Sequence, residues 1–313
     1  MSKKTLVLVL VSLLASVPAW AYERPSGAVL SAGQTGFNAE ASRDSMSQVA
    51  VYASTPMDLA FTWEFAADQT KVTFKDADTD AVQETSGTIA LGYAGFNHSF
   101  ALGYHGISST SDYNKGASGV AFDYLYYEGF NWSAGLHYGR SNYPNFIVDY
   151  QEVTTTTRSA PIPGQPPTQT TTTTYEEVTG LTINQVGLTA SKSLGLYFGL
   201  DLGLDQIMIS PAIYGQKATS FSSASAGLRA YWSTFAFNLS TYSGKRFGYL
   251  GAHALAMYSN TNIYQSGVAF STRWTMGPSS ALTVAYNQDN YLESESGPTM
   301  TGSGLSVALG LSF

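Results

Sequence analysis

Cysteine is absent from this chain of 313 residues, and charged residues make up only 12% of it. The first absence excludes disulfides and thiolate metal sites. The second leaves few ions to face water, since charged residues make up about 25% of an average soluble domain. The formal net charge is −7 at pH 7, which argues against nucleic acid as a partner.

Long apolar runs are also missing beyond the N-terminus. Residues 1–21, MSKKTLVLVLVSLLASVPAWA, combine two lysines, an apolar run from Leu6 to Leu14, and small residues at Ala19 and Ala21. This order of features predicts a secretory signal peptide that is cleaved after Ala21. No later segment approaches the roughly 18 uninterrupted apolar residues of a membrane-spanning helix, so we expect an exported protein without one.

The chain instead shows alternation. In its final ten residues, GLSVALGLSF, apolar side chains occupy every second position from Leu305 to Phe313, with Gly, Ser and Ala between them. This period of two predicts a strand with one apolar face and one face of small residues. The pattern recurs as pairs of runs around short turns, in Val49–Phe65, Ile89–Tyr104, Val120–Tyr138, Val186–Leu204, Leu228–Leu239 and Val268–Tyr286.

Repeated alternating segments of about ten residues are typical of a transmembrane β-barrel. A secreted β-sandwich or a periplasmic sheet protein also has alternating strands, but its outer faces need Lys, Glu and Arg to meet water. Here the faces opposite the apolar ones are mostly Gly, Ala, Ser and Thr. The sequence therefore predicts an all-β fold, a transmembrane antiparallel up-and-down β-barrel whose apolar face meets lipid.

Aromatic side chains lie beside the short turns and near the opposite strand ends. In membrane barrels such residues form girdles where lipid meets water. We expect one girdle from Phe100, Trp132, Trp232, Phe235, Trp274 and Phe313. The other girdle is expected to start with Tyr104, Tyr138, Tyr242 and Tyr286.

The signal peptide, the alternating strands and the terminal Phe313 together resemble a Gram-negative outer-membrane β-barrel protein. The resemblance extends over the whole chain after residue 21 and identifies no subfamily. It implies a location in the bacterial outer membrane, in contact with lipid and lipopolysaccharide. It also implies assembly by the barrel-assembly machinery, which reads a C-terminal aromatic residue such as Phe313.

The number of strands follows from the turns. If the six short turns are periplasmic, they join twelve strands, and the C-terminal strand makes thirteen. Closed bacterial barrels have an even number, so a further strand is expected before Val49, and Ser26–Asn38 is the candidate. The prediction is 14 strands, as in the monomeric porin G type. Twelve or sixteen remain alternatives, because the first strand and Phe247–Tyr258 are weakly patterned.

The chain divides into a signal peptide (1–21), an N-terminal segment (22–45) and the barrel (46–313). The N-terminal segment is expected to form the first strand, with a lumenal plug or a periplasmic tail as the alternative. The longest connection, about 142–182, carries two Thr runs around PIPGQPP. Thr favours strand and the Pro-rich centre favours a turn, which predicts an outer β-hairpin or a disordered stalk. This segment is the candidate for binding a surface partner, with a solvated loop as the alternative.

No pattern in the sequence indicates catalysis. The four histidines, His98, His105, His137 and His253, share no metal-ligand spacing. A set of Ser, His and Asp is recognised by geometry rather than by sequence. We therefore expect no enzyme, no cofactor and no metal site.

The lumen is where a function is expected, since fourteen strands lined by small residues should enclose water. The charged residues predicted to line it are Asp58, Glu64, Asp123, Asp201, Asp205, Arg229 and Arg273. The excess of carboxylates predicts passive diffusion of small hydrophilic solutes or ions with a weak cation preference, unless these groups only form ion pairs across the wall.

Two other functions are considered. The first is a structural or adhesive surface barrel that binds through the 142–182 loop. The second is an uptake channel for a small apolar compound, as in the long-chain fatty-acid transporter and the aromatic-degradation barrels. An N-terminal plug with an apolar inner pocket would support the second, but the predicted inward positions show no cluster of large apolar residues.

Overall fold

The computed structural model describes residues 27–57, 60–111, 114–129, 131–158, 169–213, 217–247, 262–293 and 297–312. These ranges form fourteen strands: β1 (Gly27–Phe37), β2 (Arg43–Pro56), β3 (Phe61–Phe74), β4 (Val82–Ala94), β5 (His98–Ser109), β6 (Ser118–Glu128), β7 (Trp132–Arg158), β8 (Gln169–Leu194), β9 (Phe198–Ser210), β10 (Ser220–Trp232), β11 (Phe235–Phe247), β12 (Ile263–Gly277), β13 (Ser280–Leu292) and β14 (Thr299–Ser312). Among these residues no helix is long and apolar enough to cross a membrane.

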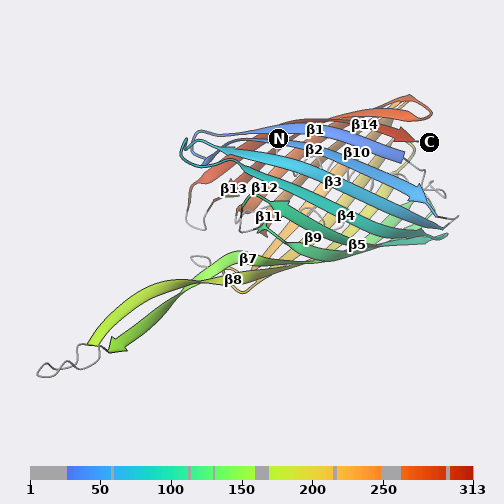
Figure 1. Ribbon diagram of the computed structural model, residues 1–313. Coiled ribbons are helices and arrows are strands. Elements are labelled where there is room, and N and C mark those ends of the chain that lie inside the picture. The colour runs from blue at the N-terminus through green and yellow to red at the C-terminus, as the bar shows by residue number, and fades with distance from the viewer. Residues whose placement is uncertain are drawn as a thin grey trace, which may run out of the picture.

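The strands close into a barrel (Figure 1). Each strand pairs in antiparallel with its neighbours in the chain, and β1 also pairs with β14, with Leu30 opposite Leu309. The predicted closed antiparallel barrel of 14 strands is confirmed. The strand β1 lies within Ser26–Asn38, where the even strand number required one. The predicted signal peptide lies outside the described residues.

The two faces of each strand differ as the alternation requires. On β14, Leu305 and Val307 are 56% and 44% exposed on the outside of the barrel, whereas Ser306 and Ala308 are 2% and 3% exposed on the inside. Transferring a Leu or Val side chain from water to an apolar medium gains roughly 1.5–3 kcal/mol. An outer face built in this way is stable in a bilayer and unfavourable in water.

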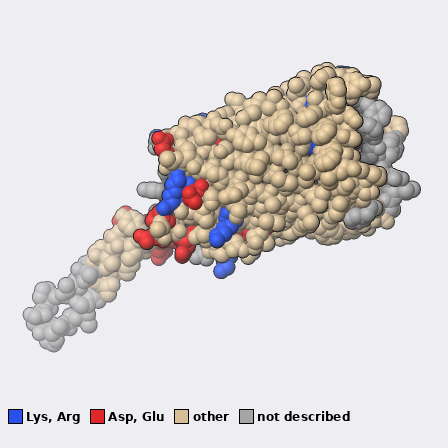
Figure 2. Space-filling model, turned by 90° about the horizontal axis from the view of Figure 1, so that it is seen from above, with Lys and Arg blue, Asp and Glu red and all other residues tan. Residues whose placement is uncertain are grey.

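On one face of the barrel, charged side chains gather toward one end of the outer surface. On the face shown in Figure 2, Lys, Arg, Asp and Glu gather at the end of the barrel from which an arm projects, and the wall between the two ends is nearly free of them. A lysine or arginine on the lipid face of a barrel costs about 2–4 kcal/mol at the bilayer midplane. This distribution is the one expected of a wall that crosses a membrane.

The arm is formed by the outer parts of β7 and β8, which are the longest strands (Figure 1). The strand β6 pairs with β7 only as far as Asn142, and β9 pairs with β8 only from Thr182. Beyond these points β7 and β8 pair with each other up to Arg158 and Gln169, after register shifts near Ile147. The described Thr runs thus form an antiparallel ribbon, and the PIPGQPP centre lies outside the described residues.

Candidate functional site in the barrel lumen

The predicted lumen-lining residues lie on the inward side of their strands. Asp201 and Asp205 on β9 alternate with Leu200, Leu202 and Leu204, which are 37–59% exposed on the outside. The same alternation places the other described members inside, namely Glu64 on β3, Asp123 on β6, Arg229 on β10 and Arg273 on β12. Asp58 lies outside the described residues. The role of these residues in ion selection stays a prediction.

One of these carboxylates is neutralised within the wall. The Arg229 side chain donates from Nη2 to Asp201 Oδ1 at 2.8 Å, and its Nε lies 2.8 Å from Oδ2. The Ser191 hydroxyl donates to the same carboxylate at 2.5 Å, and Tyr231 lies 3.3 Å from Arg229 Nη1. A charge-assisted hydrogen bond with a second close ionic contact fixes both side chains. Asp201 therefore contributes little net field to the lumen.

Closer to the end that carries the arm, which we call the outer end, six inward side chains form a connected network that we call the lumen belt. Asp205 lies 2.9 Å from His137 Nε2 and accepts from Gln185 Nε2 at 3.2 Å and from Arg246 Nη2 at 3.3 Å. The Arg246 guanidinium stacks 4.1 Å from the ring centroid of Tyr242, a favourable cation–π contact. The belt comprises His137, Gln185, Asp205, Tyr242, Arg246 and Asp289, on β7, β8, β9, β11 and β13.

The belt crosses two strands at glycines. His137, Gly187 and Asp205 are register partners on β7, β8 and β9, and a Cβ at position 187 would overlap the imidazole of His137. Tyr242 and Asp289 likewise meet over Gly267, with the phenol donating to Asp289 Oδ1 at 2.9 Å. Each bond therefore spans an intervening strand, and it can do so because that strand carries no side chain there.

A second polar group lies on the other side of the barrel. Asp68 on β3 accepts from Gln48 Nε2 at 3.1 Å and from the Ser86 hydroxyl. Glu84 on β4 accepts from Asn114 Nδ2 at 2.6 Å, which brings the loop between β5 and β6 into the lumen. These groups and Gln185, Tyr242, Arg246 and Asp289 were not predicted. Apart from Asn114, which lies in a loop, each is an even number of residues from an inward position of its own strand, so parity alone would have placed it inside.

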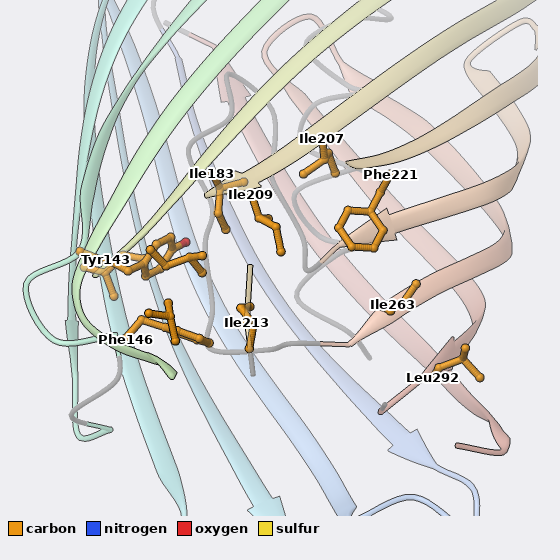
Figure 3. Close-up of a cluster of buried hydrophobic side chains, with 13 residues drawn as sticks. Tyr143, Phe146, Ile183, Ile207, Ile209, Ile213, Phe221, Ile263 and Leu292 are labelled. Carbon is orange, nitrogen blue, oxygen red and sulfur yellow. The ribbon is translucent and has the colours of Figure 1, made fainter. Parts of the chain in front are cut away.

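Apolar side chains, most of them large, cluster inside the outer end of the barrel (Figure 3). They come from β5, β7–β10, β12, β13 and two outer loops, and each is at most 8% exposed. The loop after β9 contributes Ile213 and the loop after β5 contributes Ala117. We call this group the mouth cluster: Ile107, Ala117, Tyr143, Phe146, Val148, Leu181, Ile183, Ile207, Ile209, Ile213, Phe221, Ile263 and Leu292.

The prediction that the inward positions hold no cluster of large apolar residues was wrong, as the mouth cluster shows. The stretch Gln206–Ile209 shows the reason. Here Ile207 and Ile209 face inward and are 3% and 4% exposed, while Met208 faces outward and is 38% exposed. At this height the outward face carries Gln206 and Ser210 beside Met208 while the inward face is apolar, so the contrast between an apolar outside and a small or polar inside is lost.

The mouth cluster lies directly beyond the lumen belt. On β8, Ile183 is the next inward residue after Gln185, and on β9, Ile207 follows Asp205 in the same way. Gln185 and Ile207 are register partners. A molecule entering from the outer end would meet an apolar region first and a hydrogen-bonded polar region second.

The predicted aromatic girdle residues lie near the short turns. Trp132 and Phe235 begin β7 and β11, and Trp232 ends β10, all exposed on the outside. Trp274 is the register partner of Phe235, and their rings stack at 6.2 Å. Phe100, near the start of β5, stacks on Tyr93 at 5.0 Å.

Two of the residues predicted for the girdles, Phe313 and Tyr242, are not found on the outer surface of the described barrel. Phe313, predicted both as a girdle residue and as the assembly signal, lies outside the described residues. The expectation for Tyr242 was wrong, because this side chain belongs to the lumen belt. Tyr104, Tyr138 and Tyr286 do face outward, and are 56%, 37% and 42% exposed.

Comparison with known proteins gives matches in structure only. No model of a known protein family matches the chain, and no curated protein sequence matches it. The CymD monoaromatic hydrocarbon channel has a TM-score of 0.58 at 8% identity, over 96% of this chain and 92% of that one. The Ralstonia pickettii toluene transporter TbuX has a TM-score of 0.59 at 6% identity, over 96% and 93%.

A Pseudomonas aeruginosa FadL homologue is also similar, with a TM-score of 0.55 at 8% identity over 96% of this chain and 94% of that one. At such low identity the likeness concerns the fold alone. Together with the closed sheet of fourteen strands, it establishes that this chain has the fold of the outer-membrane β-barrel proteins, which the sequence predicted.

Proposed function

We propose that this protein is an outer-membrane channel for small solutes and that its outer mouth selects apolar ones. The observation that carries the proposal is the mouth cluster, thirteen buried apolar residues gathered inside the outer end of the barrel. A hydrophobic constriction excludes water and ions by dewetting. The same surface suits an apolar molecule, because small-molecule sites are lined mainly by apolar side chains with a few polar groups.

The apolar surface that a compound with a single aromatic ring buries is enough to support binding in the mouth cluster. Such a compound is similar in size to an aromatic side chain, which buries roughly 150–250 Å². At about 25 cal/mol per Å², transfer from water into the mouth cluster gains about 4–6 kcal/mol, before the entropic cost of binding. The neighbours in fold that are named for toluene or monoaromatic hydrocarbons give independent support to this solute class.

Binding of toluene to the purified protein tests the proposal. The protein in non-ionic detergent micelles is dialysed against radiolabelled toluene, with protein-free micelles as the blank. Wild type is expected to bind in a saturable manner. Ile207→Asn places an amide in the mouth cluster and should weaken binding about tenfold or more, because an unpaired buried amide costs about 1–3 kcal/mol. The matched variant Ile207→Leu keeps the site apolar and should bind like wild type within about threefold.

A pore for hydrophilic solutes is the competing function, supported by the carboxylates Glu64, Asp123 and Asp205 on the inner wall. It predicts steady ionic conductance in planar bilayers, whereas a mouth closed by apolar side chains predicts little. Steady conductance in wild type without saturable toluene binding would refute the proposal that the mouth cluster selects apolar solutes. A change of reversal potential on removing these carboxylates would then assign the cation preference to them.

The arm supports a second role in surface binding. Its ribbon from Ile147 to Arg158 and from Gln169 to Thr179 pairs with no further strand among the described residues, so both edges are available. Free strand edges are templates for strand addition by a partner. Deleting residues 154–174 should abolish attachment of a phage or cell that uses this surface and leave toluene binding unchanged. Attachment that survives the deletion would remove the arm from this role.

A further inference from the structure

The lumen belt contains a buried amide with one unused hydrogen-bonding atom, at Gln185. This residue lies on the inner face of β8, between Ile183 and Gly187, and is 8% exposed. Its register partner on β9 is Ile207 of the mouth cluster. Gln185 is therefore at the border where the apolar mouth meets the polar belt, the place where a bound solute would have one apolar and one polar end.

The orientation of the amide follows from its neighbours. The Gln185 Nε2 group donates to Asp205 Oδ1 at 3.2 Å and lies 3.1 Å from His137 Nε2. Turning the amide over would direct its oxygen at the carboxylate, two acceptors in contact, which is unfavourable. Within the described chain the remaining atom, Oε1, is buried and accepts no hydrogen bond. A buried acceptor in that state is costly.

The polar atoms around Gln185 leave little choice of partner. Arg246 is held by Asp205 and by the Ser223 hydroxyl, to which its Nε donates at 2.6 Å. At the β13 end of the belt Asn287 is 3% exposed, and its Nδ2 donates to Asp289 at 2.7 Å. Its Oδ1 is likewise without a hydrogen bond among the described residues. The unused atoms are thus acceptors, beside carboxylates that disfavour an anion.

Building on the proposed function, we infer that the preferred solute is a small apolar molecule that carries a neutral hydroxyl group, such as a phenol. Its apolar body contacts Ile183 and Ile207 of the mouth cluster, and its hydroxyl donates to Gln185 Oε1. A pure hydrocarbon uses the apolar contacts alone. A carboxylate of the same size offers no donor to Gln185 Oε1, and its charge would lose its hydration among the apolar side chains of the mouth cluster.

Toluene, p-cresol and p-toluate test the inference, because the last two differ from a methylbenzene by one hydroxyl or one carboxylate. Their binding is measured by the same dialysis against detergent micelles. Wild type should bind p-cresol about five- to tenfold more tightly than toluene, the worth of one hydrogen bond to a buried acceptor. Binding of p-toluate should be weaker than that of toluene.

Gln185→Leu should remove the preference for p-cresol, so that p-cresol and toluene bind equally within about twofold. The matched control is Gln206→Leu, the same substitution on the outward face of β9, where the side chain is exposed and donates to Ser220. It should change neither affinity. Far-UV circular dichroism during thermal unfolding checks that each variant folds, and Gln185→Met replaces Gln185→Leu if the latter does not.

The possible outcomes separate this inference from the proposed function. Equal binding of p-cresol and toluene by wild type, or a preference that survives in Gln185→Leu, overturns the hydroxyl site while the apolar channel stands. If wild type binds neither toluene nor p-cresol, the proposed function itself is overturned. Binding of p-cresol alone, lost in Gln185→Leu, supports the hydroxyl site and refutes selection by apolar contacts.

Discussion

Substitution of Gly187 should reveal whether the lumen belt depends on the space above a glycine. A Cβ at this position would overlap the His137 imidazole and lie 2.6 Å from Asp205 Oδ1. Gly187→Ala must therefore separate His137 from Asp205. Losing a hydrogen bond to a charged group costs about 1.5–3 kcal/mol, and alanine in place of glycine within a strand returns about 0.5–1 kcal/mol. The net loss of unfolding free energy should be about 1–2 kcal/mol.

The same substitution should cost much less once the imidazole is gone. In a His137→Ala background Asp205 Oδ1 still lies 2.6 Å from the new methyl group, and the gain of about 0.5–1 kcal/mol from replacing glycine in a strand offsets that contact, so Gly187→Ala should be close to neutral. Urea unfolding of the four proteins of this double-mutant cycle in lipid vesicles gives the coupling energy. Gly87→Ala on β4 is the control, because a Cβ there has no neighbour within 4 Å. An equal effect of Gly187→Ala in both backgrounds would refute the reasoning.

Three further predictions concern the wall, the ion pair and the arm. Leu202→Arg should destabilise the barrel in a bilayer by about 2–4 kcal/mol, measured by urea unfolding, because residue 202 faces lipid; a loss below about 0.5 kcal/mol would contradict that orientation. Asp201→Asn should cost about 1.5–3 kcal/mol by leaving Arg229 unpaired, and the added substitution Arg229→Gln should recover part of it; no recovery would mean that the ion pair is not the cause. Deleting residues 154–174 should leave the midpoint of urea unfolding unchanged, and a lower midpoint would show that the arm supports the barrel.

The number of strands was predictable because it depends on the alternation within each strand and on the even number of strands that a closed bacterial barrel needs. Alternation located most strands, and the requirement for an even number led to β1 although its own pattern is weak. The faces were also predictable wherever parity was followed. Counting from Phe235 places Tyr242 inside, and the expectation of an outer girdle residue failed because it relied on residue type.

The contacts of the lumen belt could not be predicted from alternation and strand number. His137 and Asp205 are far apart in the chain, and they meet only because the registers of two hairpins bring both opposite Gly187. A shift of two residues in either register would keep every face and dissolve the contact. The mouth cluster adds Ile213 from an outer loop, and strand periodicity carries no information on where such a loop folds.

The seam between β1 and β14 has a consequence for connectivity. Gly27 and Ser312 are register partners, so the two ends of the described chain lie opposite each other at the end of the barrel where the short turns are found. A short linker between them would create one more hairpin of the kind already present. Cutting the chain elsewhere, for instance between Arg158 and Gln169, would then preserve every strand pair of the described residues, as circular permutation requires. In its pairing this barrel is a ring, and no strand in it is structurally the first.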